Sequence, residues 1–258
     1  MPTVFVSHGA PTLLIDQDPT CAFFEELGRR LPRPQAILCA SAHWERPSAR
    51  VTSGPRPETV HDFYGFPPEL YEIRYPCPGD PALAESARSL LAEAGIECGA
   101  DAGRGLDHGA WVPLSVMVPG ADIPVVQVSI LAGAGPREHL AMGRALEPLR
   151  ERGVLVIGSG GATHNLREFG AYPLDAPPLP YAREFDAWLD DVIENAKEDE
   201  VLEYTKRAPQ ASRNHPTPDH FHPLFVPLGA AGAGAKGKRL HRGFTYGVLS
   251  MAAYAWGA

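Results

Sequence analysis

Short apolar runs rich in β-branched residues alternate with helical patterns along this chain. Residues 3–7, 36–41, 123–130 and 153–159 are typical of buried strands, and helical segments separate them. Such alternation is typical of a largely parallel sheet covered by helices. We therefore expect an α/β fold with a central mixed, largely parallel sheet flanked by helices. No break in composition divides the 258 residues, so we expect one domain over residues 1–258.

Local signals mark where several of the helices begin and end. Asp80 is a predicted N-cap, Pro81 occupies the first helical position and Gly95 follows the last turn. Thr20 is a predicted cap for another helix. In all, we expect helices over 20–31, 81–94, 108–117, 136–152 and 181–197. Further strands are expected over 96–98 and 244–250, an irregular stretch over 47–78 and a surface loop over 229–238.

Five of the ten histidines lie where predicted strands or turns meet glycine, tryptophan or proline. They are His8, His43, His108, His164 and His220. Parallel strands place their carboxyl ends along one edge of a sheet, where α/β proteins bind their ligands. Imidazole is both a common metal ligand and a group that exchanges protons near neutral pH. We interpret the five histidines as one site, at the carboxyl ends of the strands.

Two of these histidines, His8 and His43, come directly after predicted strands. With a third ligand they would form a facial metal site that leaves positions open for substrate and for oxygen or water. A third ligand is offered by residues 214–223, where Thr217 can cap a helix begun by Pro218. His220 lies in that first turn, but Asp219 and His222 are alternatives that spacing does not exclude.

The glycine-rich segment 158–161 matches neither of the common phosphate-binding patterns. We interpret it as a sharp turn that places His164. His139 and His241 lie on helical and basic surface-like segments, so we expect ordinary hydrogen-bonded roles for both.

Charge and cysteine content exclude several classes of partner. The net charge is −8, with 23 basic and 31 acidic residues, and no basic patch suited to nucleic acid is present in the sequence. No apolar run approaches the ~20 residues of a membrane span, and the first residues lack a signal-peptide pattern. The four cysteines form no CxxC pair. We expect reduced thiols and a cytoplasmic enzyme without nucleic acid or membrane partners.

Eight motifs, in order along nearly the whole chain, resemble those of the class III (LigB-like) extradiol ring-cleavage dioxygenases, and of the 4,5-DOPA dioxygenase branch in particular. They are VSHGAPT at 6–12, SAHWE at 41–45, HDFYGFP at 61–67, YPCPGDP at 75–81, GLDHGAWVPL at 105–114, IPVVQVSI at 123–130, THNLRE at 163–168 and HPTPDHFHPL at 215–224. The resemblance implies a non-haem Fe(II) enzyme that opens the ring of a catechol, L-DOPA-like or another small aromatic diol, with O₂.

By motif, the resemblance assigns His8, His43 and His220 as metal ligands and His164 as an acid/base that sometimes approaches the metal. His108 corresponds to a second histidine near the oxygen pocket. Related protocatechuate-type enzymes use a carboxylate as third ligand, which keeps Asp219 open. The metal expected in the active enzyme is Fe(II), although Zn²⁺ can replace it in purified protein.

Aromatic and cationic residues near these motifs are candidates for substrate binding. They are Trp44, Phe63, Tyr64, Phe66, Arg74 and Arg167. A zinc-dependent hydrolase remains an alternative, because three histidines and a water also suit Zn²⁺. A non-enzymatic binding protein resembling the Memo family is the other alternative. The sequence leaves the cleavage position and the oligomeric state open.

Overall fold

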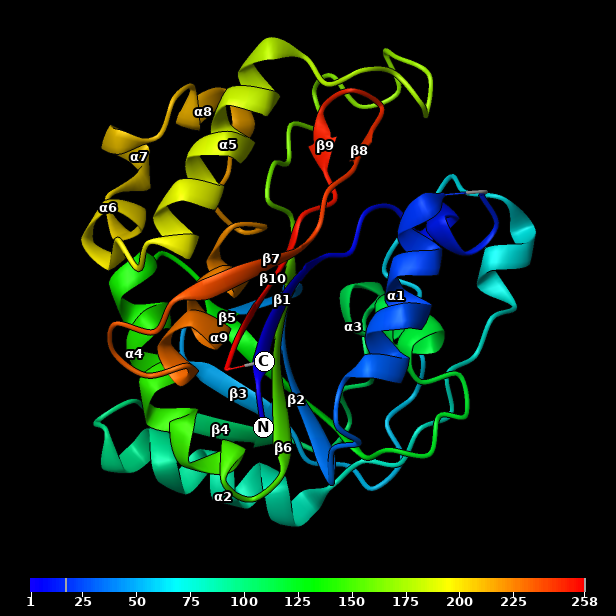
Figure 1. Ribbon diagram of the computed structural model, residues 1–258. Coiled ribbons are helices and arrows are strands. Elements are labelled where there is room, and N and C mark those ends of the chain that lie inside the picture. The colour runs from blue at the N-terminus through cyan, green and yellow to red at the C-terminus, as the bar shows by residue number, and fades with distance from the viewer. Residues whose placement is uncertain (17, 258) are drawn as a thin grey trace.

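The computed structural model describes residues 1–16 and 18–257. At its centre lies a twisted eight-stranded sheet in the order β4-β3-β5-β2-β6-β1-β10-β7 (Figure 1). Its four inner strands run parallel to one another: β5 (Val125–Leu131), β2 (Ala36–Arg46), β6 (Val154–Gly160) and β1 (Thr3–Ser7). The sheet is therefore mixed and largely parallel, as the alternating pattern predicted.

The outer strands bring antiparallel pairs to the sheet. On one side β3 (Ala49–Thr52) is antiparallel to β5 and parallel to β4 (Cys98–Asp101). On the other side β10 (Ala253–Trp256) is antiparallel to both β1 and β7 (Gly237–His241). The first and last strands of the chain are thus neighbours within one sheet.

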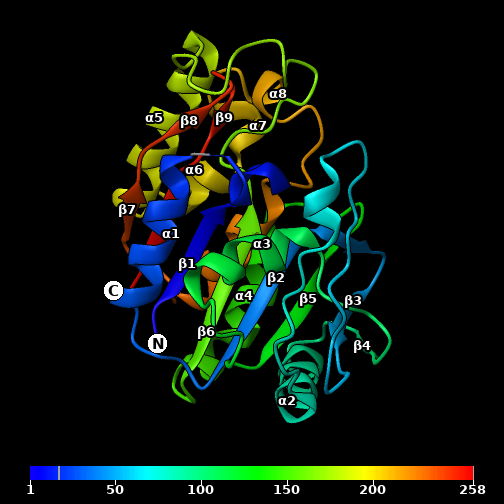
Figure 2. The same cartoon turned by 90° about the vertical axis from the view of Figure 1, so that its right-hand side faces the viewer.

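Helices cover both faces of this sheet, as Figures 1 and 2 show. On one face α1 (Pro19–Arg30) and α3 (His108–Met117) pack in the same apolar cluster as Val4 and Val6 of β1. Phe5, between them, belongs to the cluster on the opposite face, because side chains of a strand alternate. The helices of that face are α2 (Pro81–Glu93), α4 (Pro136–Leu146), α5 (Pro180–Glu194) and α9 (Phe225–Ala230). No helix of the described chain is both long and apolar enough to cross a membrane.

Several predicted boundaries were wrong. Asp18, and not Thr20, caps α1, because its carboxylate accepts a hydrogen bond from the Thr20 amide. β2 continues to Arg46, so His43 lies inside a strand and not after one. The stretch 47–78 contains β3 and the 3₁₀ turn Pro68–Tyr71. The predicted helix 136–152 ends at Leu146 and is followed by a 3₁₀ turn, Glu147–Arg150.

The last third of the chain departs furthest from expectation. No helix begins at Pro218; residues 219–221 form a turn that leads into the 3₁₀ turn His222–Leu224. The predicted strand 244–250 is a hairpin of β8 (Phe244–Thr245) and β9 (Leu249–Ser250). The ends of the loop predicted over 229–238 belong to α9 and β7. The remaining short helices are the 3₁₀ turn Pro11–Leu14, α6 (Glu198–Leu202), α7 (Tyr204–Arg207) and α8 (Ala211–Asn214).

Candidate active site

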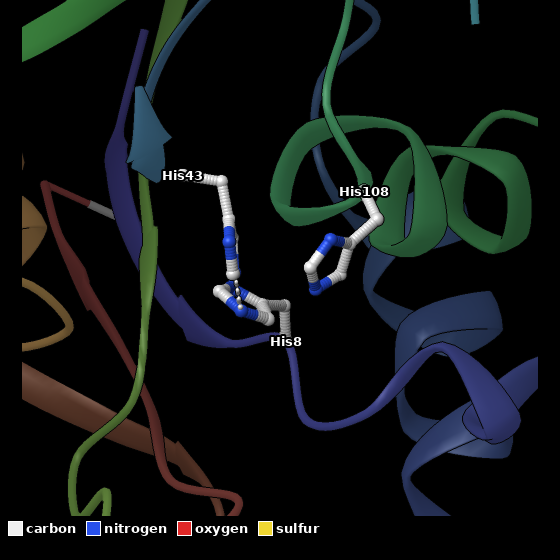
Figure 3. Close-up of side chains that lie close together, drawn as sticks. All are labelled: His8, His43 and His108. Carbon is white, nitrogen blue, oxygen red and sulfur yellow. Dashed lines mark hydrogen bonds between the residues drawn. The ribbon is translucent and has the colours of Figure 1, made fainter. Parts of the chain in front are cut away.

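The histidines come together at the carboxyl edge of the parallel strands. His8 directly follows β1 and is buried. His43 lies in an irregular part of β2, where Ser41 and Glu45 pair with consecutive residues of β5 and the residues between them have no partner. Such a bulge re-aims side chains next to active sites. Figure 3 shows the rings of His8 and His43 meeting edge to edge, with His108 facing them from the start of α3.

Three ring nitrogens converge at the centre of this cluster. The Nε2 atom of His43 lies 3.1 Å from Nε2 of His8 and 3.2 Å from Nε2 of His220. Two nitrogens that share a metal at 2.0–2.2 Å are separated by about 3.0–3.4 Å. Both distances from His43 therefore fit ligands of a single ion.

The other ring nitrogen of each of these histidines faces an oxygen atom. Nδ1 of His8 lies 3.0 Å from the Ser159 hydroxyl. That hydroxyl donates its own proton to the Gly109 carbonyl, so it accepts a hydrogen bond from Nδ1 of His8. Nδ1 of His220 donates to the Asp219 carboxylate. Nδ1 of His43 lies 3.4 Å from a carboxylate oxygen of Asp62.

These contacts place the ring proton on Nδ1 and leave Nε2 as a bare lone pair. Three lone pairs that point at one another repel unless a cation lies between them. Histidines that hold metals are oriented in this way, by an outer oxygen on the nitrogen that does not bind. The residues present therefore fit a divalent metal.

Asp62, which sequence reasoning missed, links two histidines. One of its oxygens accepts hydrogen bonds from the backbone amide of His108 at 2.9 Å and from Nδ1 of the same residue at 3.0 Å. Its other oxygen faces His43. Burial alone would raise the pKa of Asp62, but the hydrogen bond and charge of His108 hold it below its usual value. Asp62 is thus an anion that orients His108 and His43 together.

His164 and His220 form the other side of the cluster. Their rings are stacked, with centroids 3.4 Å apart and planes inclined by 9°. The glycines of 158–161 do not form the predicted turn, because β6 runs through Gly160. A Cβ atom at Gly160 would lie 2.1 Å from the His220 carbonyl oxygen, and one at Gly158 equally close to that of Pro223. These glycines let the segment that carries His220 lie against the strand.

Burial sets the protonation of the cluster. It lowers the pKa values of His8 and His43 well below their usual range, and the neighbouring histidines lower them further. Burial, followed by the contact with His220, lowers the pKa of His164 to about 2. His8, His43 and His164 are therefore neutral near neutral pH, and a neutral imidazole is the form that binds a metal or accepts a proton.

Two other groupings of potential ligands exist among the described residues. Ligand atoms of His8, His43 and His108 lie within 4.8 Å of one another, and so do those of His164, Asp219 and His220. Asp219, an alternative third ligand, contacts Nδ1 of His220 and so lies behind it. His222, the other alternative, stacks on His139 with a centroid distance of 4.3 Å and belongs to neither grouping.

A cavity of about 350 Å³ opens over the histidine cluster, and all five histidines line it. This volume is at the lower end of the range of small-molecule sites, about 300–1,000 Å³. Its other large side chains are apolar: Phe63, Phe66, Leu166, Phe169, Leu249 and Met251. Of the predicted substrate-binding residues, the structure brings Phe63 and Phe66 to the cavity.

The structure does not bring the other candidates there. Trp44 is buried, and its ring lies under the guanidinium of Arg104 at 5.5 Å. Tyr64 is 92% exposed. Arg74 donates to the carbonyls of Tyr71 and Ile73, and Arg167 is exposed. None of these four residues lines the cavity.

Comparison with known proteins identifies the family. The family described as "Catalytic LigB subunit of aromatic ring-opening dioxygenase" matches residues 2–257. The chain belongs to this family of metal-dependent ring-opening dioxygenases, and is therefore an oxidoreductase. The motif-based assignment to the LigB-like extradiol enzymes is confirmed.

Individual relatives match over almost the whole chain. The "4,5-DOPA dioxygenase extradiol" of Beta vulgaris is 42% identical over 256 residues, which cover 98% of this chain and 95% of that protein. The protein of the same name from Escherichia coli K12 is 38% identical, covering 89% of this chain and 85% of its own. A crystal structure of an uncharacterised protein from the same bacterium covers 100% of both chains, with a TM-score of 0.82 and 33% identity.

Proposed function

We propose that residues 1–258 form one catalytic domain, an Fe(II)-dependent extradiol dioxygenase that opens the ring of a small catechol with O₂. The observation that carries this proposal is the set of three Nε2 lone pairs that meet below an apolar cavity. The names of the relatives, 4,5-DOPA dioxygenase, support a catechol as the substrate.

His8, His43 and His220 would hold the metal through Nε2, with Ser159, Asp62 and Asp219 orienting their rings. Bound there, Fe(II) would supply Lewis acidity that lowers the pKa of a diol hydroxyl, and would leave coordination positions for substrate and O₂. Three imidazole nitrogens, each with an oxygen atom on its outer side, suit a divalent metal ion.

His164 and His108 are the proton-transfer groups of this proposal. His164 stacks on His220, so its ring lies where it can take a proton from a diol held beside His220. His108 donates from Nδ1 to Asp62, which leaves its Nε2 free to accept and return a proton on the opposite side of the cluster. The two bases thus lie on either side of the central ring nitrogens.

The apolar walls would hold the aromatic ring and exclude water. The rings of Phe63 and Phe66 meet edge to face with centroids 5.5 Å apart, and Phe63 also lies edge to face with His108 at 5.6 Å. Aromatic side chains in such arrangements form rigid walls. They restrict a flat substrate to orientations that keep its polar edge toward the histidines.

The decisive test is anaerobic reconstitution with Fe(II), followed by O₂ uptake and detection of a ring-opened product. Catechol, 4-methylcatechol, L-DOPA and protocatechuate should be offered in turn, with hydroquinone as a control that cannot chelate. We expect stoichiometric O₂ uptake with at least one catechol and none with hydroquinone. Hydrolysis by the zinc-loaded protein, without O₂ uptake by the iron-loaded protein, would favour the hydrolase alternative instead.

A further inference from the structure

A buried ion network joins β7 to α5, the long helix that runs beside the β8–β9 hairpin (Figure 1). Arg239 donates to the Asp186 carboxylate at 2.8 and 3.1 Å and to the Asp190 carboxylate at 2.6 Å. All three side chains are buried. Replacing a buried ion pair with apolar side chains often leaves stability unchanged, so stability alone does not explain the network.

One carboxylate of this network reaches the wall of the active-site cavity. Asp186 accepts a hydrogen bond from the hydroxyl of Ser250, a residue of β9 that lines the cavity. Asp190 accepts instead from the Tyr254 hydroxyl at 2.7 Å. Neither carboxylate is among the described residues that line the cavity. The two carboxylates therefore share Arg239 but differ in what they hold.

Strand β9 in turn holds the residue that precedes His164. The backbone amide of Ser250 donates to the Thr163 hydroxyl at 2.6 Å, and that hydroxyl donates to the Val248 carbonyl at 2.8 Å. The Thr163 side chain is buried, so it cannot shift without leaving one of these groups unpaired. The position of β9 therefore fixes the chain at Thr163.

The same helix holds His164 from its other side. The backbone amide of His164 donates to the Asn214 carbonyl at 2.9 Å, and the Asn214 side chain donates to the Tyr181 carbonyl in α5 at 3.2 Å. The side-chain amide of Asn165 donates to the Tyr181 hydroxyl, also at 3.2 Å. Contacts that lead back to α5 thus fix the chain before, at and after His164.

We propose that Asp186 is a positioning residue for His164. It acts through the hydroxyl of Ser250 and the clamp on Thr163, and Arg239 holds its carboxylate in place. This inference rests on the proposed function, in which His164 transfers a proton. A misplacement of about 1 Å can cost a reaction about 10²-fold, so loss of this anchor lowers kcat without removing the metal.

Asp186→Ala and Asp190→Ala form a matched pair, because each removes one carboxylate from Arg239. Both variants should lose stability to a similar extent in urea denaturation. In the Fe(II) enzyme, Asp186→Ala should lower kcat by about tenfold or more, with KM and iron content within about twofold of the unmodified protein. Asp190→Ala should keep kcat within about twofold. Equal losses of kcat in the two variants would overturn this inference.

A double-mutant cycle shows whether the effect passes through His164. In the His164→Gln background no base remains to be positioned, so Asp186→Ala should lower kcat by less than about twofold further. A further loss as large as in the unmodified background would mean that Asp186 acts elsewhere, and would overturn the inference.

Milder variants keep the test sound if Asp186→Ala does not fold. Ser250→Ala removes the hydroxyl that contacts Asp186 and leaves the ion pairs of Arg239 in place. Thr163→Val removes the clamp at nearly constant volume, whereas Thr163→Ser keeps the hydroxyl. Ser250→Ala and Thr163→Val should each lower kcat by about tenfold, and Thr163→Ser should recover most of it. Equal kcat values for the valine and serine variants would contradict the clamp.

Nuclear magnetic resonance of the histidine rings in the metal-free protein gives a readout that does not depend on turnover. The signal of His164 is the one that His164→Gln lacks. It should shift in Asp186→Ala, Ser250→Ala and Thr163→Val and stay in place in Asp190→Ala. An unmoved signal in the first three variants would overturn this inference even if the enzyme is active. Failure of the unmodified Fe(II) protein to open any catechol would overturn the proposed function, and the ring signals would still decide whether Asp186 positions His164.

Discussion

The two halves of the histidine cluster are built in different ways. His8 directly follows β1, and His43 lies in the bulge of β2 between Ser41 and Glu45, so paired strand residues next to both histidines anchor them. His164 and His220 lie on irregular segments after β6, and contacts between parts of the chain distant in sequence hold them in place. We call His8 and His43 the strand half of the cluster, and His164 and His220 the loop half. The strand half is held by the sheet, whereas the loop half is held by close backbone packing.

This difference suggests a division of labour. Residues that directly adjoin paired strand residues have little freedom to shift, so they suit the task of holding a metal at fixed distances. Residues on loops can move by fractions of an ångström as a substrate binds, which suits proton transfer. His220 is the exception, because it lies on the loop side and yet contributes a nitrogen to the central group.

Replacement of His43 should have the largest effect of all. Its Nε2 lies within 3.2 Å of Nε2 of His8 and of Nε2 of His220. His43→Ala therefore removes the ligand that is next to both of the others. We expect loss of bound iron and a fall in turnover of about 10³-fold or more. Iron content and O₂ uptake, measured on the same sample, check this. A variant that keeps its iron would show that the metal lies elsewhere.

His164→Gln should leave the metal in place and lower kcat by about 10²- to 10⁴-fold, because it removes a proton acceptor and not a ligand. His108→Gln should do the same if the bases on both sides of the cluster are used. His241→Gln, outside the cavity, is the matched control and should retain full activity. Loss of iron in the His164 variant would instead make that residue a ligand.

The strand half was the more predictable part of the site. The position of His8 after a buried β-run indicated the sheet edge, and that edge is where the structure places it. His43 was assigned to the same edge, but it lies in a bulge that lengthens β2, and a bulge has no simple sequence signal. The structure also shows why Gly109 follows His108: a Cβ atom there would lie 2.4 Å from the Ser41 hydroxyl.

The loop half was predictable only from the resemblance between motifs. The expected helix at Pro218 is absent, and residues 219–221 form a turn in its place. Residues 211–224 are held by long-range contacts, such as that between the amide of Gly161 and the carbonyl of His220. Local propensity does not contain this information. Asp62 was missed for the same reason, because its partners lie 19 and 46 positions away.

The two outer carboxylates offer one probe for each half. Asp219→Asn should weaken iron binding by about 10- to 100-fold, since His220 loses an anionic partner. Asp62→Asn should weaken it less, because the contact with His43 is longer at 3.4 Å, but should also lower kcat through His108. Iron titration alongside kcat at saturating iron separates the two effects. Identical behaviour of the two variants would contradict the distinction between the halves.

The smallest effect that we expect comes from Gly160→Ala, which tests whether strand packing positions the loop half. The added methyl group would lie 2.1 Å from the His220 carbonyl oxygen, so the backbone of that segment has to move. Such crowding costs about 1–3 kcal/mol of stability, measurable by urea denaturation of the metal-free protein. Iron affinity should fall modestly, because two of the three ligands stay in place.

Gly103→Ala is the matched control, since a Cβ atom there has its nearest neighbour at 3.8 Å. That variant should differ from the unmodified protein by less than about 0.5 kcal/mol. Equal stability and iron affinity in both variants would mean that the position of His220 does not depend on its contact with β6.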